Sequence, residues 1–449
     1  MKFAGALVAG ALLLSGCLHH NVVRNADRLY SRAEVERRAG RENAAAMVYA
    51  DIVRKTGQAL RAHPNNDWAD EALLLLGQSR LRLGEYGESQ AALVALGRRT
   101  ETPGLRIEAD IYLGVLKEEV GEPEEALGLV NAALKAAEIE GRGAIGDEAR
   151  AEAYLLRGRI LLERGQPDRA WLDLDRAVDA DRDAAVEVAM ERLQWAIASN
   201  DPDRTRFAVD ALLADPRAGV RVDSVGLAVW AAADQWGARA GADLLAGTDS
   251  ATWPRAARDR IVLQRARLLD AAGDTAAASD QALRVAGGLG ISAAEGRLLL
   301  SEWRAQRARD LPEIYALRAL LLPAAGTASV SRRLRAIDRL ELFASVGLDD
   351  SLGWFAAAEV ARDYFGAEYL ARGLFLAYAD GSPGEPWVPK SLLAALEVSK
   401  EEADRAWLRG RLEGHRESPY VLAAHGGTSA GFEELEEELE VRLKELTNE

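Results

Sequence analysis

Three stretches with one shared spacing decide the fold: "LLGQSRLRLGEYGES" (75–89), "YLGVLKEEVGEPEEA" (112–126) and "LRGRILLERGQPDRA" (156–170). Each has a glycine, a second glycine seven residues later, and a small residue five positions beyond the second. Recurrence of one internal spacing along a chain is the signature of a repeat protein, in which each short unit packs on its neighbours. The repeated positions are Gly77, Gly84 and Ser89, then Gly114, Gly121 and Ala126, then Gly158, Gly165 and Ala170.

This spacing predicts a pair of packed helices in each stretch. The first glycine and the later small residue let two helix backbones approach closely, and the second glycine ends the first helix in a conformation that glycine adopts at low cost. Segments such as 71–83 and 258–271 place apolar residues at i, i+3, i+4 and i+7, while alternating strand patterns are nearly absent. The sequence therefore predicts an all-α protein.

The three stretches resemble the tetratricopeptide (TPR) repeat, which carries Gly or Ala at its position 8, Gly at 15, Tyr at 17 and Ala at 20. Tyr86 matches position 17 in the first stretch, whereas Pro123 and Pro167 occupy that position in the other two. The first glycines are 37 and 44 residues apart, so the units carry insertions. The resemblance covers about residues 66 to 180.

The resemblance implies a right-handed α-solenoid of TPR-like helix hairpins that is degenerate in the C-terminal half. We expect TPR-like repeats in 46–182 and degenerate helix pairs in 183–425, where Gly237, Gly273 and Gly366 each keep an alanine five positions later. In the family, side chains of the first helix of each pair line a groove for partners. The corresponding residues are Gln78, Leu81, Arg82, Val115, Glu118, Glu119, Arg159, Leu162 and Glu163.

The N-terminal segment is typical of a bacterial lipoprotein signal. Lys2 precedes an apolar run, 3–14, which is shorter than the roughly 20 residues that a membrane span needs. The run ends in "LSGC" (14–17), which resembles the lipobox, and Cys17 is the single cysteine of the chain. The resemblance implies that the signal is removed before Cys17 and that Cys17 carries the lipid, so the mature chain is anchored to a membrane without spanning it.

The residue after the anchor bears on the compartment. Position 18 is Leu rather than the Asp that retains lipoproteins in the inner membrane of enteric bacteria. We therefore expect attachment to the outer membrane on its periplasmic side, or to the cell membrane in an organism without an outer membrane. The expected organisation is a signal peptide at 1–16, a tether and first helix at 17–45, the repeats, and a Gly-rich hinge with an acidic terminal helix at 426–449.

The terminal helix has an apolar stripe, formed by Phe432, Leu435, Leu439, Leu443 and Leu446. The spacing is coiled-coil-like but extends over only about two heptads, where a stable coiled coil needs three or four. We interpret 432–449 as a capping or solvated helix, and weak self-association through it is the alternative.

Motifs for chemistry are weak in this sequence. "GTSAG" (427–431) and "GLGISA" (288–293) match nucleophile and nucleotide-binding patterns, but no strand pattern precedes either. Glu417-Ser418 is similar to part of a lytic transglycosylase motif, but too few residues follow for that catalytic domain. The five histidines have no metal-binding spacing, namely His19, His20, His63, His415 and His425.

A formal net charge of −15 disfavours nucleic acid as a partner, because phosphate binding needs a basic face. We expect no enzymatic activity, no cofactor, no metal and no small-molecule substrate. The predicted function is a lipid-anchored periplasmic scaffold that binds envelope proteins whose identity is open, with outer-membrane assembly or secretion as candidate processes. The alternative is an accessory factor of peptidoglycan metabolism, non-catalytic or related to lytic transglycosylases.

Overall fold

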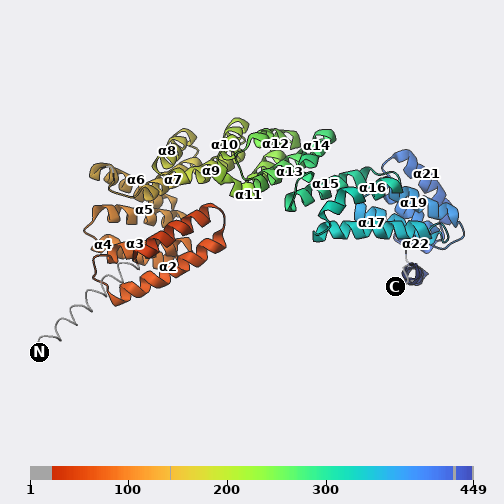
Figure 1. The fold of residues 1–449 in the computed structure, drawn as a ribbon, viewed down its shortest axis with the longest axis horizontal. Helices are drawn as coiled ribbons and strands as arrows, with labels where there is room; N and C mark the ends of the chain where they lie inside the picture. The colour runs from red at the N-terminus through yellow and green to blue at the C-terminus, as the bar shows by residue number, and fades with distance from the viewer. Residues whose placement is uncertain (1–22, 142, 428–430, 447–449) are drawn as a thin grey trace, which may run out of the picture. The chain divides into compact units, whose positions relative to one another are not determined.

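The computed structural model describes residues 23–141, 143–427 and 431–446, and every regular element in these residues is a helix. The predicted all-α repeat class is therefore confirmed, since within each unit many helices pack against the next helix of the chain (Figure 1). The contacts divide the chain into two compact units, unit 1 up to Ile261 and unit 2 from Val262 to the C-terminus. The boundary predicted at residue 182 thus lies inside unit 1.

Unit 1 begins, in the described residues, with a helix at 23–38. The α-helices that follow it are α2 (Glu42–Ala62), α3 (Ala69–Arg82), α4 (Tyr86–Arg99), α5 (Pro103–Glu119), α6 (Pro123–Glu140), α7 (Asp147–Glu163), α8 (Pro167–Ala180), α9 (Ala185–Ala198), α10 (Pro202–Ala214), α11 (Val222–Trp236) and α12 (Ala238–Leu244). The 3₁₀ helices are η1 (Arg182–Ala184), η2 (Pro216–Arg221) and η3 (Ala246–Ser250).

The division between the units falls within α13 (Arg255–Ala271). Unit 2 continues with α14 (Thr275–Ala286), α15 (Ile291–Arg307), α16 (Leu311–Leu321), α17 (Ala328–Val346), α18 (Leu352–Phe365), α19 (Glu368–Gly381), α20 (Val388–Glu397), α21 (Glu402–Leu412), α22 (Pro419–Ala424) and α23 (Gly431–Glu445). Its 3₁₀ helices are η4 (Leu322–Ala324) and η5 (Glu413–His415).

The helix ends in unit 1 follow the predicted glycines. Gly84, Gly121 and Gly165 have φ of +76°, +82° and +67° and lie in the turns that join α3 to α4, α5 to α6 and α7 to α8. These angles belong to the left-handed region, which L-residues with a side chain adopt only at a cost. The second glycine of each stretch therefore ends the first helix of a pair.

The first glycines allow the paired helices to touch. A Cβ atom on Gly77 would lie 2.7 Å from the side chain of Leu93, and one on Gly114 would lie 2.8 Å from Cγ2 of Val130. A Cβ atom on Gly158 would lie 2.9 Å from Cδ2 of Leu174. Side chains in a close-packed interior have no room for such an atom, so the spacing reflects helix–helix contact.

The degenerate region keeps the same turn chemistry. Gly237, Gly273 and Gly366 have φ of +89°, +81° and +58° and separate α11 from α12, α13 from α14 and α18 from α19. Each of these glycines therefore lies between two consecutive helices, and the repeat character predicted for 183–425 stays a prediction. Near the other end of the chain, Gly40 follows the first helix and has φ of +73°. The boundary predicted at 45/46 falls inside α2, which begins at Glu42.

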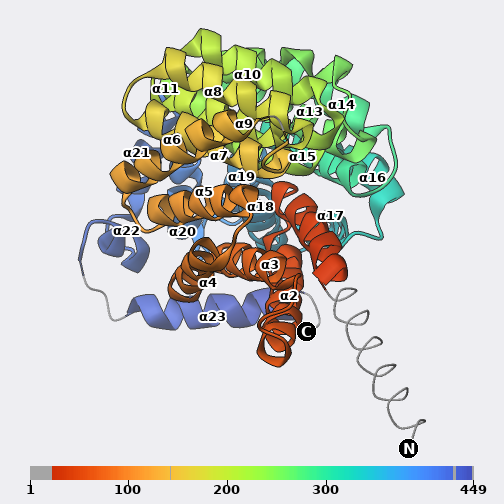
Figure 2. The same ribbon diagram turned by 90° about the vertical axis from the view of Figure 1, so that its left-hand side faces the viewer.

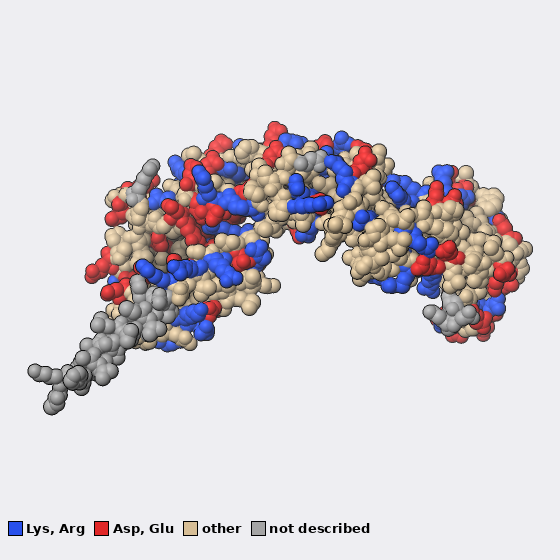
Figure 3. Space-filling view, in the orientation of Figure 1, with Lys and Arg blue, Asp and Glu red and all other residues tan. Residues whose placement is uncertain are grey.

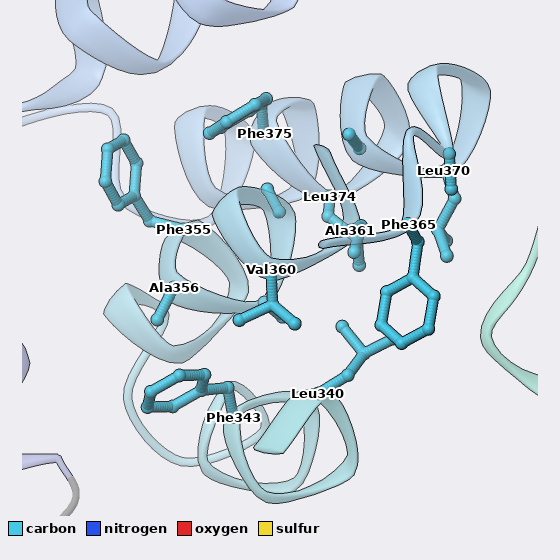
Figure 4. Close-up of a cluster of buried hydrophobic side chains, with 14 of the residues drawn as sticks. Leu340, Phe343, Phe355, Ala356, Val360, Ala361, Phe365, Leu370, Leu374 and Phe375 are labelled. Carbon is cyan, nitrogen blue, oxygen red and sulfur yellow. The ribbon is translucent and has the colours of Figure 1, made fainter. Parts of the chain in front are cut away.

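Unit 2 is held together by a core of aromatic and aliphatic side chains (Figure 4). The ring of Phe355 on α18 meets those of Phe375 and Tyr378 on α19 edge-on, with centroids 5.5 Å apart in both pairs. Leu340 and Phe343 bring α17 to the same cluster. Each such buried side chain contributes about 1.5–3 kcal/mol, so these contacts fix α17, α18 and α19 relative to one another.

The apolar stripe of α23 packs on this core of unit 2. Leu439 is buried, with 2% of its surface exposed, and the other stripe residues are partly buried against the same cluster. The indole Nε1 of Trp387 donates a hydrogen bond to the backbone oxygen of Leu435 at 3.0 Å, and Lys390 pairs with Glu436 at 2.7 Å. The described part of 432–449 is therefore a helix docked on the core of unit 2, and self-association through its stripe stays an untested alternative.

Candidate partner-binding groove

The predicted groove residues lie on one series of neighbouring helices in unit 1. Three come from α3, three from α5 and three from α7, each the first helix of a glycine-marked pair. Their exposure differs widely. Gln78, Leu81, Val115 and Leu162 are buried, Arg82, Glu118 and Arg159 are partly buried, and Glu119 and Glu163 are exposed.

The helix of residues 23–38 lies against this series of helices. Figures 1 and 2 show it at the red end of the colour scale, beside α2 and next to α3, α5 and α7. Its apolar residues, among them Tyr30 and Ala33, join a buried cluster with Tyr49 of α2 and Leu75 of α3. The Tyr30 and Tyr49 rings are 5.8 Å apart between centroids. Part of the predicted groove is therefore already occupied by the chain itself.

Glu34 is the centre of the polar contacts that hold this helix. Its carboxylate is 3% exposed and lies 3.0 Å from Nε of Arg82 and 2.8 Å from Nη2 of Arg37. Tyr49 is a third partner, and its hydroxyl donates a hydrogen bond to Glu34 at 2.5 Å. Arg82 also pairs with Glu152 of α7 at 3.1 Å, so this predicted groove residue bridges the first helix and the repeats.

The surroundings of Glu34 keep its carboxyl ionised. Burial alone would raise the pKa of Glu34, but the charges of Arg82 and Arg37 and the hydrogen bonds from Arg37 and Tyr49 outweigh burial and hold the pKa well below its ordinary value. A buried carboxylate with these partners is satisfied. Removing one partner would leave an uncompensated charge in the interior.

The other end of the same helix is tied to α9, to η2 and to the residue that follows α8. Arg37 pairs with Glu187 at 3.1 Å, and Arg38 pairs with Asp181 at 2.9 Å. Arg221 donates hydrogen bonds from Nε to the backbone oxygen of Arg38 at 2.8 Å and from Nη2 to that of Arg37 at 3.0 Å. Cations are favourable at a helix C-terminus, where carbonyl groups lack partners.

Figure 3 shows acidic and basic side chains side by side over unit 1.

A cavity of about 440 Å³ remains between the helix 23–38 and the repeats. Asp27 and Tyr30 line it on one side, and Gln78, Tyr112 and Glu148 line it on the other. Burial, with the nearby charge of Glu34, raises the pKa of Glu148 to about 7, which Arg38 only partly offsets. Glu148 is therefore a group of this site whose charge changes near neutral pH.

A strip of paired charges lies beyond this network. Arg159 of α7 pairs with Glu118 of α5 at 3.5 Å and with Glu191 of α9 at 3.0 Å. Glu119, which is exposed, accepts a hydrogen bond from the hydroxyl of Tyr86 at 3.4 Å. Of the predicted groove residues, Glu118, Glu119, Arg159 and Glu163 are reached by solvent outside the Glu34 network, so they are the part of the groove open to a partner. Binding at these positions stays a prediction.

The sequence prediction missed the role of Glu34, Arg37 and Arg38. Nothing in the local pattern links Glu34 to Arg82 or Arg37 to Glu187, which lie 48 and 150 residues away along the chain. Glu34 is buried and Arg37 and Arg38 are partly buried, and charged side chains in such places are almost always paired. That burial follows from the fold and cannot be read from the local sequence.

The remaining candidate residues form no assembled site in the described residues. Cys17 and Ser429 lie outside them, whereas "GLGISA" forms the turn from α14 into α15, and Ser418 immediately precedes α22. Within the described ranges, no group of three or more His, Cys, Asp or Glu side chains could hold a metal ion. None of the helices described is both long and apolar enough to cross a bilayer.

Comparison with known proteins gives structural likeness alone. No protein-family model matches the chain, and no curated protein matches it. A thermophilic TPR protein of Thermus thermophilus is similar over 43% of this chain and 90% of its own, at 21% identity and a TM-score of 0.30. A TPR protein of Parabacteroides merdae is similar over 62% of this chain and 98% of its own, at 16% identity and a TM-score of 0.30. The fold assignment therefore rests on the described helices and their packing.

Proposed function

We propose that the chain is a helical-repeat scaffold that binds protein partners in the cell envelope. The observation that carries this proposal is the architecture of packed helix pairs in both units. Arrays of this kind present extended faces of side chains to a partner. Two exposed positions in unit 1, Glu119 and Glu163, and the partly exposed charges beside them are the surface that we assign to this role.

We further propose that lipid on Cys17 holds the scaffold at the outer membrane, on the periplasmic side. The support is the "LSGC" motif at 14–17 after a short apolar run, together with Leu18. Only five residues separate Cys17 from Val23, which is buried at the start of the first described helix. Unit 1 would then lie close to the membrane. The protein acts without a cofactor and has no catalytic activity of its own.

Site-specific photo-crosslinking in intact cells tests the scaffold. A photoreactive residue at Glu119 or Glu163 should give discrete crosslinked products, whereas one at the exposed Asp203 of α10 serves as the control. Outer-membrane assembly or secretion components among the products support the proposed process. Peptidoglycan enzymes or glycan strands would instead favour the accessory role in wall metabolism, and turnover of purified peptidoglycan by the protein alone would overturn the non-enzymatic assignment.

Fractionation tests the anchor. Cys17→Ala should abolish lipid attachment, so the variant remains unprocessed or leaves the membrane fraction, while His19→Ala should behave like the wild type. The mass of the mature chain measures lipidation directly. A Cys17→Ala variant with normal mass and normal membrane association would overturn the anchor.

A further inference from the structure

Unit 2 contains a cleft of about 580 Å³ that is lined by four arginines and one acid. The arginines are Arg332, Arg333, Arg335 and Arg339, all on α17, and the acid is Glu302 on α15. Its apolar lining comes from Leu298 of α15, Ala336 of α17, and Val360 and Tyr364 of α18. Such a concentration of cations is notable in a chain with a formal net charge of −15.

The arginines of this cleft are not neutralised by their neighbours. Among the described residues, Arg332, Arg335 and Arg339 make no ion pair. The acids nearby on α17 are engaged elsewhere: Arg318 pairs with Asp338 at 2.7 Å and with Glu341 at 2.8 Å. The cleft therefore keeps an excess of positive charge.

Arg333 lies deeper than the other three. Its Nη1 donates a hydrogen bond to the backbone oxygen of Tyr364, its guanidinium stacks 4.6 Å from the centroid of the Phe365 ring, and its buried Nε has no partner. Burial lowers the pKa of Arg333, and Glu302 only partly compensates. A cation held in this position favours an anion nearby.

The geometry suits an extended chain better than a single ion. Residues 332 and 339 are seven positions apart on one helix, which places them about 10 Å apart along its axis. Side chains that point the same way from an extended peptide repeat about every 6.5–7 Å, so two neighbouring carboxylates of this kind fit within the roughly 10 Å between residues 332 and 339. Leu298, Val360 and the exposed Tyr364 ring would receive the intervening apolar side chains.

We propose that this cleft binds an extended segment of a partner protein in which acidic and apolar residues alternate. Arginine matches carboxylates with paired hydrogen bonds, which would supply the affinity of the cleft for acidic side chains. The inference rests on the proposed scaffold function and assigns a partner chemistry to unit 2. A volume of about 580 Å³ accommodates a few peptide side chains and falls within the range of ligand sites.

Fluorescence anisotropy with the full chain tests this directly. The probe is a labelled nine-residue peptide in which glutamates alternate with leucines, and the comparison peptide has glutamines in place of the glutamates. We expect the first peptide to bind at least tenfold more tightly, and more weakly as salt rises. The double variant Arg332→Glu, Arg335→Glu should lose at least tenfold in affinity. Both side chains are exposed, so the fold should be retained.

Glu302→Gln gives the sharper test, because it should improve binding. Removing the one acid of the cleft relieves repulsion of the peptide carboxylates, so we expect a two- to fivefold gain in affinity, which general damage to the fold would not produce. Arg416→Glu, an exposed arginine of unit 2 outside the cleft, is the matched control and should leave affinity unchanged. Equal losses in Arg416→Glu and the double variant would overturn the proposal.

Two further outcomes separate the hypotheses. Tighter binding to phosphatidylglycerol vesicles than to the peptide, lost in the same double variant, would assign the cleft to lipid headgroups and overturn the peptide proposal. If the envelope partners crosslinked by the wild type are unchanged in the double variant, and the peptide does not bind, the cleft proposal fails while the scaffold stands. Peptide binding without any discrete crosslinked partner would instead contradict the scaffold.

Discussion

Nε of Arg82 lies 3.0 Å from Oε1 of Glu34, so a helix outside the repeats is joined to the first repeat by a buried ion pair. Breaking a buried pair by removing one partner costs about 3–5 kcal/mol, because the other charge stays in the interior. We therefore expect Glu34→Gln to lower the free energy of unfolding of unit 1 by about 3 kcal/mol. Urea denaturation followed by circular dichroism measures this loss.

A double-mutant cycle distinguishes this pair from surface charges. Glu34→Gln and Arg82→Met together should show a coupling of about 2 kcal/mol, since the two side chains touch. The control is Asp51 and Lys55, a partly exposed i,i+4 pair of α2 at 2.6 Å, whose coupling should be about 0.5 kcal/mol or less. A coupling for Glu34 and Arg82 no larger than this control would show that the contact does not hold the helix.

The same pair predicts a pH dependence on the acid side. The pKa of Glu34 lies below its ordinary value of 4.5, so its stabilising contribution is complete above that pH and is lost as pH falls towards the pKa in the folded state. The wild type should therefore lose stability below about pH 4.5 more steeply than Glu34→Gln. Parallel stability curves for the two proteins would contradict this assignment.

The raised pKa of Glu148 predicts that stability falls as pH rises towards neutral, the opposite of the dependence expected from Glu34. Its pKa is raised from 4.5 to about 7, so the folded state binds more protons than the unfolded state between these values, and ionisation of Glu148 destabilises the fold as pH rises. Glu148→Gln should be more stable than the wild type at pH 8 by about 1 kcal/mol, a modest value because solvent screens the partly exposed side chain. The difference should vanish near pH 4.

Urea denaturation at both pH values measures the Glu148 effect. Glu163→Gln, an exposed acid at the end of α7, is the control and should change stability little at either pH. A stabilisation by Glu148→Gln that is equal at pH 4 and pH 8 would point to packing rather than to titration.

The contrast between local and distant contacts explains what the sequence could predict. Gly77 and Leu93 are sixteen residues apart within one helix pair, so a fixed spacing reveals their contact. The helix pairs of unit 1 and their glycine turns follow from such local patterns, whereas the groove residues were assigned by the family resemblance. Arg37 and Glu187 are 150 residues apart, and no periodicity connects them. The occupation of the groove by residues 23–38 depends on this kind of contact and was therefore not predicted.

Unit 2 shows the same limit in a different form. The four arginines of its cleft follow one another on α17, but their meaning depends on Leu298 of α15 and Val360 of α18. Only the packing of three helices shows that these residues border one cavity. The sequence shows the apolar stripe of α23 but does not show that it packs on the core of unit 2. An apolar stripe can pack on any apolar surface, so its pattern does not identify the surface that it contacts.

The glycines at the helix contacts predict a test of the repeat geometry. A Cβ on Gly114 would lie 2.8 Å from Cγ2 of Val130 and 3.3 Å from the backbone oxygen of Ala126, so Gly114→Ala should destabilise unit 1 by about 1–3 kcal/mol. Gly128 lies within α6 with no atom within 4 Å of the added Cβ. Gly128→Ala should instead stabilise by up to about 1 kcal/mol, because alanine favours helix. Equal effects of the two substitutions in thermal denaturation would contradict the close contact at Gly114.

Substitution of Leu439 tests whether α23 is an integral part of unit 2. The side chain is 2% exposed, so Leu439→Ala should lower the free energy of unfolding by about 2–3 kcal/mol, through lost burial and the cavity that remains. Val441 on the same helix is 55% exposed, and Val441→Ala should change stability by about 0.5 kcal/mol or less. Tryptophan fluorescence during urea denaturation measures both, since Trp387 contacts α23 through the Leu435 backbone. If the stripe served self-association instead, Leu439→Ala would shift the sedimentation equilibrium towards monomer and leave the unfolding of the monomer unchanged.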